Sequence, residues 1–170
     1  METSRNESIL AVYDAHVETI YRYVYRRCRD HSLAEDITQE TFMTAVRYAE
    51  DSSKLNIAWL QTVARNRLFD VLRRDVRSEE KLRLIANSST SSSEVNPVER
   101  MRVQEGLEAL PIHYRLVLTL HYLNGVPVAD IAEQLERTAK SVEGLLARAR
   151  RALATELEPA SSYSGEGGNS

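Results

Sequence analysis

The fold is decided by the stretch VADIAEQLERTAKSVEGLLARARRAL, residues 128–153. Apolar residues recur at helical spacing on both sides of a short polar turn. Pro127 can open a first helix, which we expect over Val128–Leu135. Thr138 is the expected N-cap of a second helix that runs to about Leu157. A short helix, a tight turn and a long basic helix form a helix-turn-helix pattern.

The two faces of this pattern differ in chemistry. Ile131, Ala132 and Leu135 would pack against Val142 and Leu146. Such hairpins bind DNA when the opposite face of the second helix is polar and basic. The candidate DNA-binding residues here are Thr138, Lys140, Ser141, Glu143, Gly144, Ala147, Arg148 and Arg151, with Arg150 extending the positive face. A helical hairpin with an exposed basic face and no DNA partner is the alternative interpretation.

Two further helices are expected upstream of this hairpin. The first covers about Pro97 to Ala109 and stops before Pro111, because the residue before proline avoids the helical conformation. The second covers Ile112–Leu123 and ends at Asn124-Gly125, where glycine can take the left-handed cap.

Composition favours helices throughout the chain and two small domains. Apolar residues make up 42%, with 6 Gly and 4 Pro among 170 residues, and no alternating β-branched run is present. The Ser-rich stretch that begins at Asn87 has too little apolar surface to fold, so it predicts a linker. We therefore expect an all-α protein with helical domains at 8–86 and 97–157, a flexible linker at 87–96 and a disordered tail at 158–170.

The first domain has three predicted helices. One covers Ile9–Arg29, and the next covers Leu33 to about Tyr48, with Ser32 as its N-cap and Glu35 at the capping-box position. A loop follows, and a long third helix starts near Asn56. The expected core residues are Val12, Val17, Ile20, Val24, Cys28, Ile37, Phe42, Ala45, Trp59, Leu60, Val63, Ala64, Leu68, Val71 and Leu72.

Charge is distributed unevenly along the chain. The net charge is −3, which by itself does not suit a nucleic-acid-binding protein. Residues 57–85 nevertheless carry seven basic and four acidic side chains, and residues 137–153 carry five and one. Two basic segments in an acidic chain can each neutralise phosphates locally. Solvated helix faces would explain the same pattern.

Three motifs occur in order and together make the pattern specific. They are Ala34-Glu-Asp-Ile-Thr-Gln-Glu-Thr-Phe42, Ala58-Trp-Leu-Gln-Thr-Val-Ala-Arg-Asn66, and Leu110-Pro111 followed by the helix-turn-helix. With these motifs the chain resembles the extracytoplasmic-function RNA polymerase sigma factors over about residues 8–155. The resemblance implies a region 2 helical bundle and a region 4 helix-turn-helix, and a role in promoter-specific initiation by core RNA polymerase.

The resemblance also implies a polymerase-docking face. In this family the helix that carries the first motif docks on the clamp helices of the polymerase, which points here to Asp36, Gln39, Glu40 and Thr41. Asp36, Gln39 and Glu40 lie one helical turn apart, and a polar acidic stripe suits a basic protein partner. Val117, Leu118 and Leu120 could meet the polymerase flap or belong to the core.

The third helix and the loop before it are implied to hold the −10 element, in which a base is flipped out of the non-template strand. An amide such as that of Asn66 can pair with a base edge, and arginines suit the backbone. The candidates are Tyr48, Lys54, Arg65, Asn66, Arg67, Arg73, Arg74 and Arg77. Trp59 is expected in the core, and Tyr48 is the candidate stacking group of the loop.

Two departures from the family pattern concern the −35-binding hairpin. Glu136 stands where a turn glycine is usual, which predicts a differently shaped turn. Glu143, Gly144 and Leu145 replace frequent Lys, Ser and Arg, and an acid facing the groove repels phosphates. We therefore expect an atypical −35 preference.

Several classes of function are not supported by the residues. The four histidines show no ligand spacing with Cys28, so we expect no metal and no cofactor. No phosphate loop or nucleophile motif is present, so we expect no enzyme and no small-molecule substrate. Without a signal peptide or membrane segment, the expected location is the cytoplasm.

The expected partners are core RNA polymerase (clamp helices and flap), promoter DNA and an anti-sigma factor. A stand-alone helix-turn-helix regulator and a helical adaptor or inhibitor protein are the alternatives. Run-off transcription with core polymerase separates the three.

Overall fold

The structure is a computed structural model that describes residues 2–48, 52–85 and 100–158. Every regular element in these ranges is helical, which confirms the all-α class. The elements are α1 (Glu2–Cys28), α2 (His31–Arg47), the short 3₁₀ turn η1 (Ser52–Lys54), α3 (Ile57–Ile85), α4 (Arg100–Ala109), α5 (Ile112–Leu118), the π-helical turn η2 (Thr119–Leu123), α6 (Val128–Leu135) and α7 (Ala139–Leu157). The predicted linker at 87–96 and all of the predicted tail except Glu158 lie outside the described residues.

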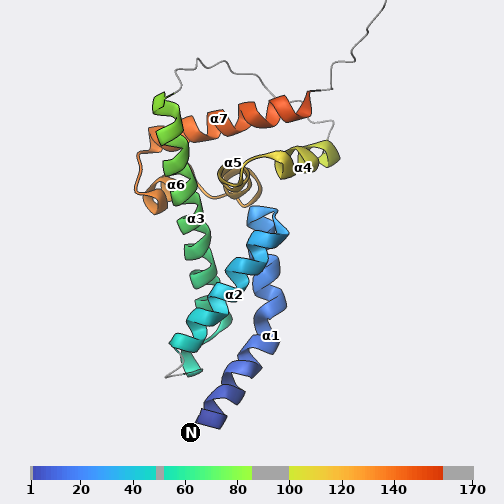
Figure 1. Ribbon diagram of the computed structural model, residues 1–170, viewed down its shortest axis with the longest axis vertical. Helices are drawn as coiled ribbons and strands as arrows, with labels where there is room; N and C mark the ends of the chain where they lie inside the picture. Colours follow the sequence, from blue (N-terminus) through green and yellow to red (C-terminus); the bar gives the residue numbers. More distant parts are fainter. Residues whose placement is uncertain (1, 49–51, 86–99, 159–170) are drawn as a thin grey trace, which may run out of the picture.

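Helices α1, α2 and α3 form an elongated bundle, and α4 to α7 cover one end of it (Figure 1). The last turns of α3 pass beside α7, far along the sequence. Contacts of α3 with α5 and α6, and of α1 with α5 and η2, join the two halves. The two predicted domains therefore pack directly against each other.

The junction between α1 and α2 differs from the prediction. The N-cap of α2 is Asp30, whose Oδ1 accepts a hydrogen bond of 2.8 Å from the backbone N–H of Leu33, and the predicted cap Ser32 is already helical. The preceding residue, Arg29, has a positive φ of 53° and ends α1. An aspartate three residues before Leu33 can cap as well as a serine, and its earlier position starts the helix earlier.

The beginning of α1 was also predicted too late. The helix starts at Glu2, before the expected start at Ile9. Residues 2–8 are polar and show no apolar periodicity, but none of them is Gly or Pro, so nothing interrupts the helix. Ser8 donates a hydrogen bond to the Ser4 carbonyl at 2.9 Å.

Most of the remaining predicted boundaries are confirmed. Helix α6 covers Val128–Leu135 as predicted, and Thr138 caps α7 by accepting from the Ser141 N–H at 3.1 Å. Gly125 has a φ of 67°, as expected for the residue that ends η2. Asn56 caps α3, because its Oδ1 accepts from the Trp59 N–H at 3.0 Å.

The turn of the helix-turn-helix keeps the shape that a glycine would give. Glu136 lies in the left-handed region, with φ 54° and ψ 43°. The N–H of Arg137 donates to the Ala132 carbonyl at 2.9 Å, which closes α6. The predicted change of turn shape is therefore wrong: the glutamate accepts the backbone conformation that glycine adopts without strain.

Replacing Glu136 with Gly should raise the free energy of unfolding by about 0.5–1 kcal/mol, because a left-handed Cβ costs about 1 kcal/mol or more and the added chain entropy offsets part of it. Urea denaturation followed by circular dichroism measures the change. Glu133→Gly, in the interior of α6, should instead destabilise by about 1 kcal/mol. Destabilisation of similar size in both variants would contradict the assignment of strain to Glu136.

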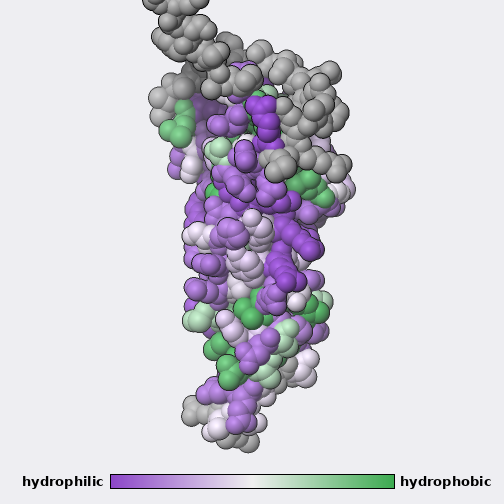
Figure 2. All heavy atoms as spheres, turned by 90° about the vertical axis from the view of Figure 1, so that its right-hand side faces the viewer, coloured by the Kyte–Doolittle hydropathy of each residue, from purple (hydrophilic) through white to green (hydrophobic). Residues whose placement is uncertain are grey.

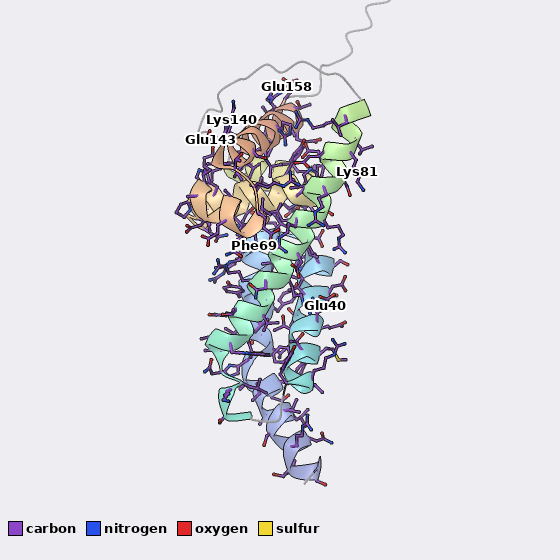
Figure 3. The ribbon with its side chains drawn as sticks, turned by 90° about the vertical axis from the view of Figure 1, so that its left-hand side faces the viewer. Glu40, Phe69, Lys81, Lys140, Glu143 and Glu158 are labelled. Atoms are coloured by element: carbon purple, nitrogen blue, oxygen red, sulfur yellow. The ribbon has the colours of Figure 1, made fainter. Side chains whose placement is uncertain are left out.

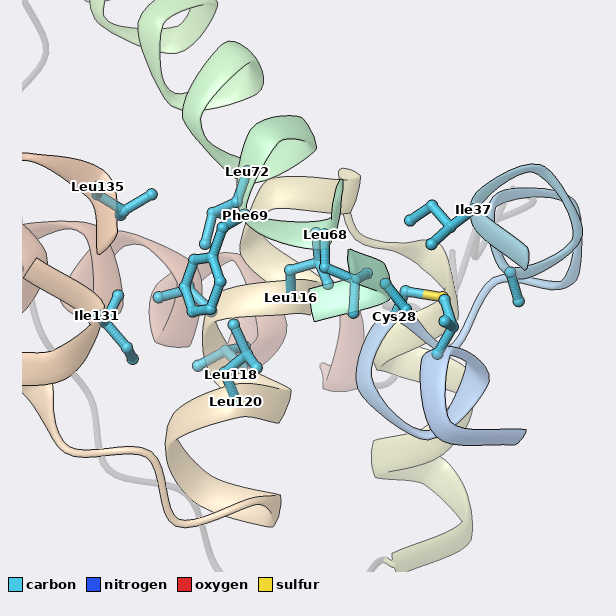
Figure 4. Packing of buried hydrophobic residues seen from close by; sticks show 14 of the residues in the cluster. Cys28, Ile37, Leu68, Phe69, Leu72, Leu116, Leu118, Leu120, Ile131 and Leu135 are labelled. Carbon is cyan, nitrogen blue, oxygen red and sulfur yellow. The ribbon is translucent and has the colours of Figure 1, made fainter. Parts of the chain in front are cut away.

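The core runs without interruption across both halves of the molecule. Figure 4 shows Phe69 of α3 between Leu72 on its own helix and the side chains of Leu118, Leu120 and Ile131. Phe69 is 2% exposed, although the sequence did not single it out. Ile20, Val24, Cys28, Ile37, Phe42, Ala45, Leu60, Ala64, Leu68 and Leu72 are buried as predicted, whereas Val12, Val17, Trp59, Val63 and Val71 are only half-buried.

Candidate polymerase and nucleic-acid interfaces

An exposed polar stripe lies along α2. The side chains of Asp36, Gln39 and Glu40 are exposed, as the helical spacing predicted. Thr41 is fully buried, and its hydroxyl donates to the Ile37 carbonyl at 2.7 Å. Thr41 is therefore not available to a protein partner, because it lies on the opposite side of the helix from Asp36 and Gln39.

The stripe is tied to the neighbouring helix at Glu40. Its carboxylate lies 3.6 Å from Nε of Arg67 on α3, and both side chains are well exposed. Figure 3 shows Glu40 on α2 beside α3. The pair joins the predicted protein-docking stripe to the predicted −10 surface, and its exposure limits it to about 1 kcal/mol or less.

An apolar groove adjoins the stripe, between α1 and α2. Its volume is 530 Å³, and its lining residues are Asn6, Ile9, Leu10, Tyr13, Gln39, Phe42, Met43 and Val46. Leu10 and Met43 are 61% and 56% exposed. Figure 2 shows apolar side chains gathered toward the lower end of the molecule, where α1 and α2 lie. The apolar repeat at Leu10, Tyr13 and Val17 is the sequence signal for this groove. Periodicity alone does not distinguish side chains of the core from side chains of an exposed docking surface.

Most of the predicted −10 residues are exposed to solvent. Arg65, Asn66, Arg74 and Arg77 are exposed, and Arg67 is partly exposed. Tyr48, which follows α2, is 69% exposed and Lys54 of η1 is exposed; the residues 49–51 between them lie outside the described ranges. The basic residues of α3 are spread around the helix: Arg67 faces Glu40 of α2, whereas Arg65 lines a pocket with residues of α1 and η2.

Arg73 differs from the rest of this set. Its Nε donates to the Gln134 carbonyl of α6 at 2.9 Å, and its guanidinium also pairs with Asp70 at 2.7 Å. Only 28% of the side chain is exposed. In this conformation Arg73 is a contact between the two halves of the molecule, so the prediction of a free DNA-binding arginine does not hold for it.

The second helix of the helix-turn-helix presents part of its predicted face. Figure 3 shows Lys140 and Glu143 at the surface near the start of α7, and both are exposed. Ser141, Gly144, Ala147 and Arg151 are half-buried, and the N-cap residue Thr138 is exposed. Leu145, which stands where the family often has arginine, is 2% exposed and belongs to the core.

Arg148 is not free either. Its Nε donates to Oε1 of Glu79, near the end of α3, at 2.9 Å, and only 16% of its side chain is exposed. A Cβ built on Gly144 would lie 3.3 Å from a terminal nitrogen of Arg148, so the guanidinium passes across this glycine. The guanidinium of Arg148, which was predicted to contact DNA, is therefore paired with a carboxylate of the same chain.

Sequence reasoning missed Arg115, the most highly connected side chain of the described residues. Its Nε donates to the Leu107 carbonyl at 2.8 Å, and other donors reach the carbonyls of Glu108 and Leu110. A further nitrogen donates to the Arg29 carbonyl at 3.0 Å and pairs with Asp30 at 3.3 Å. Arg115 is 6% exposed and caps the end of α4. The only sequence signal was a charged residue within an apolar run.

The proposed flap-binding residues are in the core. Val117, Leu118 and Leu120 are at most 4% exposed, so the possibility that they form an apolar surface is wrong. The exposed apolar side chains in this region are Tyr122 and Leu123, at 55% and 56%. The π-helical hydrogen bond from the Asn124 N–H to the Thr119 carbonyl, 3.0 Å, shifts the register here relative to an α-helix.

Cys28, between Arg27 and Arg29 in the sequence, is fully buried, and burial raises the pKa of its thiol to about 11, which disfavours the reactive thiolate. Within the described ranges, no three His, Cys, Asp or Glu side chains are grouped as metal ligands. None of the described helices is long and apolar enough to cross a membrane.

Both halves of the chain match sigma factor families. Residues 12–78 match Sigma-70 region 2, and residues 100–153 match Sigma-70, region 4. The relatives include ECF RNA polymerase sigma factor SigL of Mycobacterium tuberculosis, 33% identical over 87% of this chain and 88% of SigL. Sigma factor SigM of Bacillus subtilis is 29% identical over 84% of this chain and 90% of SigM.

Two solved structures also resemble the chain in part. One is sigma factor RpoE in complex with the anti-sigma factor NepR from Bartonella quintana, with a TM-score of 0.45 and 22% identity over 89% of this chain and 95% of that chain. The other is the RsbN–BldN complex, with a TM-score of 0.35 and 25% identity over 90% of this chain and 94% of that chain. The family rests on the sequence matches: a match to region 2 as well as region 4 is not expected for a stand-alone helix-turn-helix regulator. The chain therefore belongs to the extracytoplasmic-function RNA polymerase sigma factors, which act in promoter-specific initiation of transcription.

Proposed function

We propose that the exposed stripe of α2 is the surface by which this sigma factor docks on the clamp helices of core RNA polymerase. Asp36, Gln39 and Glu40 are the polar contacts, and the 530 Å³ groove beside Gln39 accepts apolar side chains of the same partner. The observation that carries this proposal is the joint exposure of an acidic stripe and large apolar residues on one side of α1 and α2. Tyr122 and Leu123 are the candidates for the flap contact.

The two halves of the chain bind different elements of the promoter DNA. Residues 8–86 bind and melt the −10 element along α3, and residues 97–157 bind the −35 element through α7. The exposed Arg65, Arg74 and Arg77 suit phosphates, and Asn66 offers a donor and an acceptor to an unpaired base. Lys140 and Glu143 are the exposed candidates for base contacts in the −35 element.

The test is run-off transcription with core polymerase and a genomic template library, with and without this protein. Promoter-dependent transcripts should appear only when the protein is present. If no template yields a promoter-dependent transcript, the proposal that α3 binds the −10 element and α7 binds the −35 element is rejected. The reaction chemistry belongs to the polymerase, so the chain itself needs no catalytic residue.

Replacing Asn66 with Ala should change the base preference within the −10 element and lower initiation about tenfold at the best promoter, because a lost base contact costs about 1–3 kcal/mol. Sequencing of transcripts from a promoter library with randomised −10 positions measures the preference. Asn124→Ala, which removes an exposed amide from the other half of the chain, serves as the control. If the Asn66 variant keeps the wild-type base preference, Asn66 does not contact a base of the −10 element.

The resemblance to this class extends the proposal in two directions. We place the protein in the cytoplasm, where core polymerase is found. We also expect an anti-sigma factor that covers the polymerase-docking and DNA-binding surfaces. Recovery of a specific inhibitor with the tagged full chain from its own cells, displaced by core polymerase, is the test of this part.

A further inference from the structure

A single carboxylate at the end of α3 binds groups from two helices of the other half. Glu79 accepts from Nε of Arg148 at 2.9 Å, and it also accepts from the hydroxyl of Tyr114. Nε2 of His113 lies 3.4 Å from its second oxygen. Only 10% of the Glu79 side chain is exposed. We call Glu79, His113, Tyr114 and Arg148 the Glu79 cluster.

Two further polar contacts join the same surfaces. Arg137, in the turn before α7, pairs with Glu80 of α3. Arg73 of α3 donates to the Gln134 carbonyl at the end of α6. Arg73, Arg137 and Arg148 are thus all bonded within the chain. Of these, Arg73 and Arg148 lie on α3 and α7, the helices proposed to bind promoter DNA.

Apolar packing holds the same arrangement together. Phe69 lies one helical turn before Arg73 on α3 and packs toward Leu118, Leu120 and Ile131 of the other half (Figure 4). The closed arrangement, in which α4 to α7 pack on α1 to α3, therefore combines a buried aromatic with a cluster of charged hydrogen bonds. Two of these contacts, those of Arg73 and Arg148, occupy side chains that the sequence predicts for DNA binding.

The cluster uses the chemistry by which arginine binds a phosphate. A carboxylate offers acceptor oxygens to a guanidinium, as a phosphate does, so the Nε–H that Arg148 donates to Glu79 is not available to DNA. We propose that Glu79 acts as an internal substitute for a DNA phosphate, and that the closed arrangement is an autoinhibited state in which α7 and α3 block each other from promoter DNA. This inference rests on the proposed DNA-binding roles of the two helices.

The protonation of Glu79 fits this role. Burial by itself would raise the pKa of Glu79. The nearby imidazole of His113 and the hydrogen bonds from Tyr114 and Arg148 outweigh burial and lower the pKa from 4.5 to about 2. A lowered pKa means that the carboxylate stabilises the closed arrangement above about pH 4.5 and loses this effect only as the pH falls toward 2. At neutral pH the Glu79 carboxylate is therefore ionised.

The test is Glu79→Gln in the full chain, without polymerase. Glutamine keeps the size of the side chain but removes its charge, so the closed arrangement should weaken about tenfold, as for loss of a charged hydrogen bond. The radius of gyration from small-angle X-ray scattering should increase. Affinity for a −35 duplex, selected from a random library with the wild-type protein, should rise about fivefold to tenfold. Glu105→Gln, an exposed position on α4, is the charge-matched control and should change neither.

A reciprocal charge exchange tests the closed arrangement independently of Glu79. Neither Glu80 nor Arg137 is among the proposed DNA contacts. Glu80→Arg should open the molecule and strengthen duplex binding, and adding Arg137→Glu should restore the wild-type radius of gyration. Circular dichroism shows whether each variant is folded. If Glu79→Gln and Glu80→Arg both fold, and both keep the wild-type radius and duplex affinity, the autoinhibited state is refuted.

The outcome is separable from the proposed function. Wild-type protein that supports promoter-dependent run-off transcription, combined with unaltered compactness and duplex affinity in both variants, would reject the autoinhibitory contact and leave the sigma role of α3 and α7 intact. Loss of promoter-dependent transcription with every variant and the wild type would instead reject the DNA-binding roles.

Discussion

Replacing Arg115 with methionine should lower the free energy of unfolding by about 3–5 kcal/mol. Arg115 is 6% exposed, and its guanidinium donates to carbonyls of Leu107, Glu108 and Leu110 at the end of α4. Methionine fills a similar volume but supplies no donors, so these carbonyls and that of Arg29 would lose the hydrogen bonds of the guanidinium. Equilibrium urea denaturation followed by circular dichroism measures the loss.

The control for Arg115 is an arginine with no comparable role. Arg26→Met changes an exposed residue of α1 by the same substitution and should alter the free energy of unfolding by no more than about 0.5 kcal/mol. Arg115→Lys should recover little of the stability, since one ammonium cannot reach all of the carbonyls that the planar guanidinium bonds. A loss below about 1 kcal/mol for Arg115→Met would show that water replaces the guanidinium.

Replacing Asp36 and Gln39 together with alanine should weaken binding to core polymerase by about tenfold to a hundredfold, because each truncated interface contact costs about 1–2 kcal/mol. Both side chains are exposed on α2, so the substitution should leave the fold unchanged. Competition with a fluorescent wild-type protein for core polymerase measures the affinity. Binding of the selected −35 duplex, which depends on α7, should remain at the wild-type level.

An acid and an amide on another surface provide the matched control. Gln104→Ala with Glu105→Ala removes the same kinds of side chain from exposed positions of α4. This variant should bind core polymerase as the wild type does. Equal losses of polymerase and duplex binding in the Asp36 and Gln39 variant would contradict the separation of the two surfaces, and equal losses in both double variants would indicate a nonspecific charge effect.

Periodicity and capping residues predicted much of the secondary structure. Helix α6 has the predicted bounds, and Thr138, Gly125 and Asn56 end or begin helices where the sequence indicated. These features depend on contacts within a few residues, which the local sequence contains. The errors at Asp30 and at the start of α1 arose where several polar residues in succession could serve as caps or be helical.

The candidate site was predictable only in part. Helical spacing correctly placed Asp36, Gln39 and Glu40 on an exposed face, and the two basic segments coincide with helices α3 and α7. Helical spacing could not show that Thr41 faces inward or that Val117 and Leu118 are in the core. The type of a residue on a helix does not indicate which neighbouring helix covers it. The same limit hid the apolar groove between α1 and α2.

The sequence by itself determined that this chain is helical, where most of its helices lie and, through three ordered motifs, which family it resembles. Only the tertiary structure decided that Arg148 faces Glu79, that Arg73 bonds the end of α6, and that Arg115 joins α4 to the α1–α2 junction. These contacts link residues 61 to 86 positions apart. The physical reason is that caps and periodicity are local, whereas the partner of a charged side chain depends on how whole helices pack.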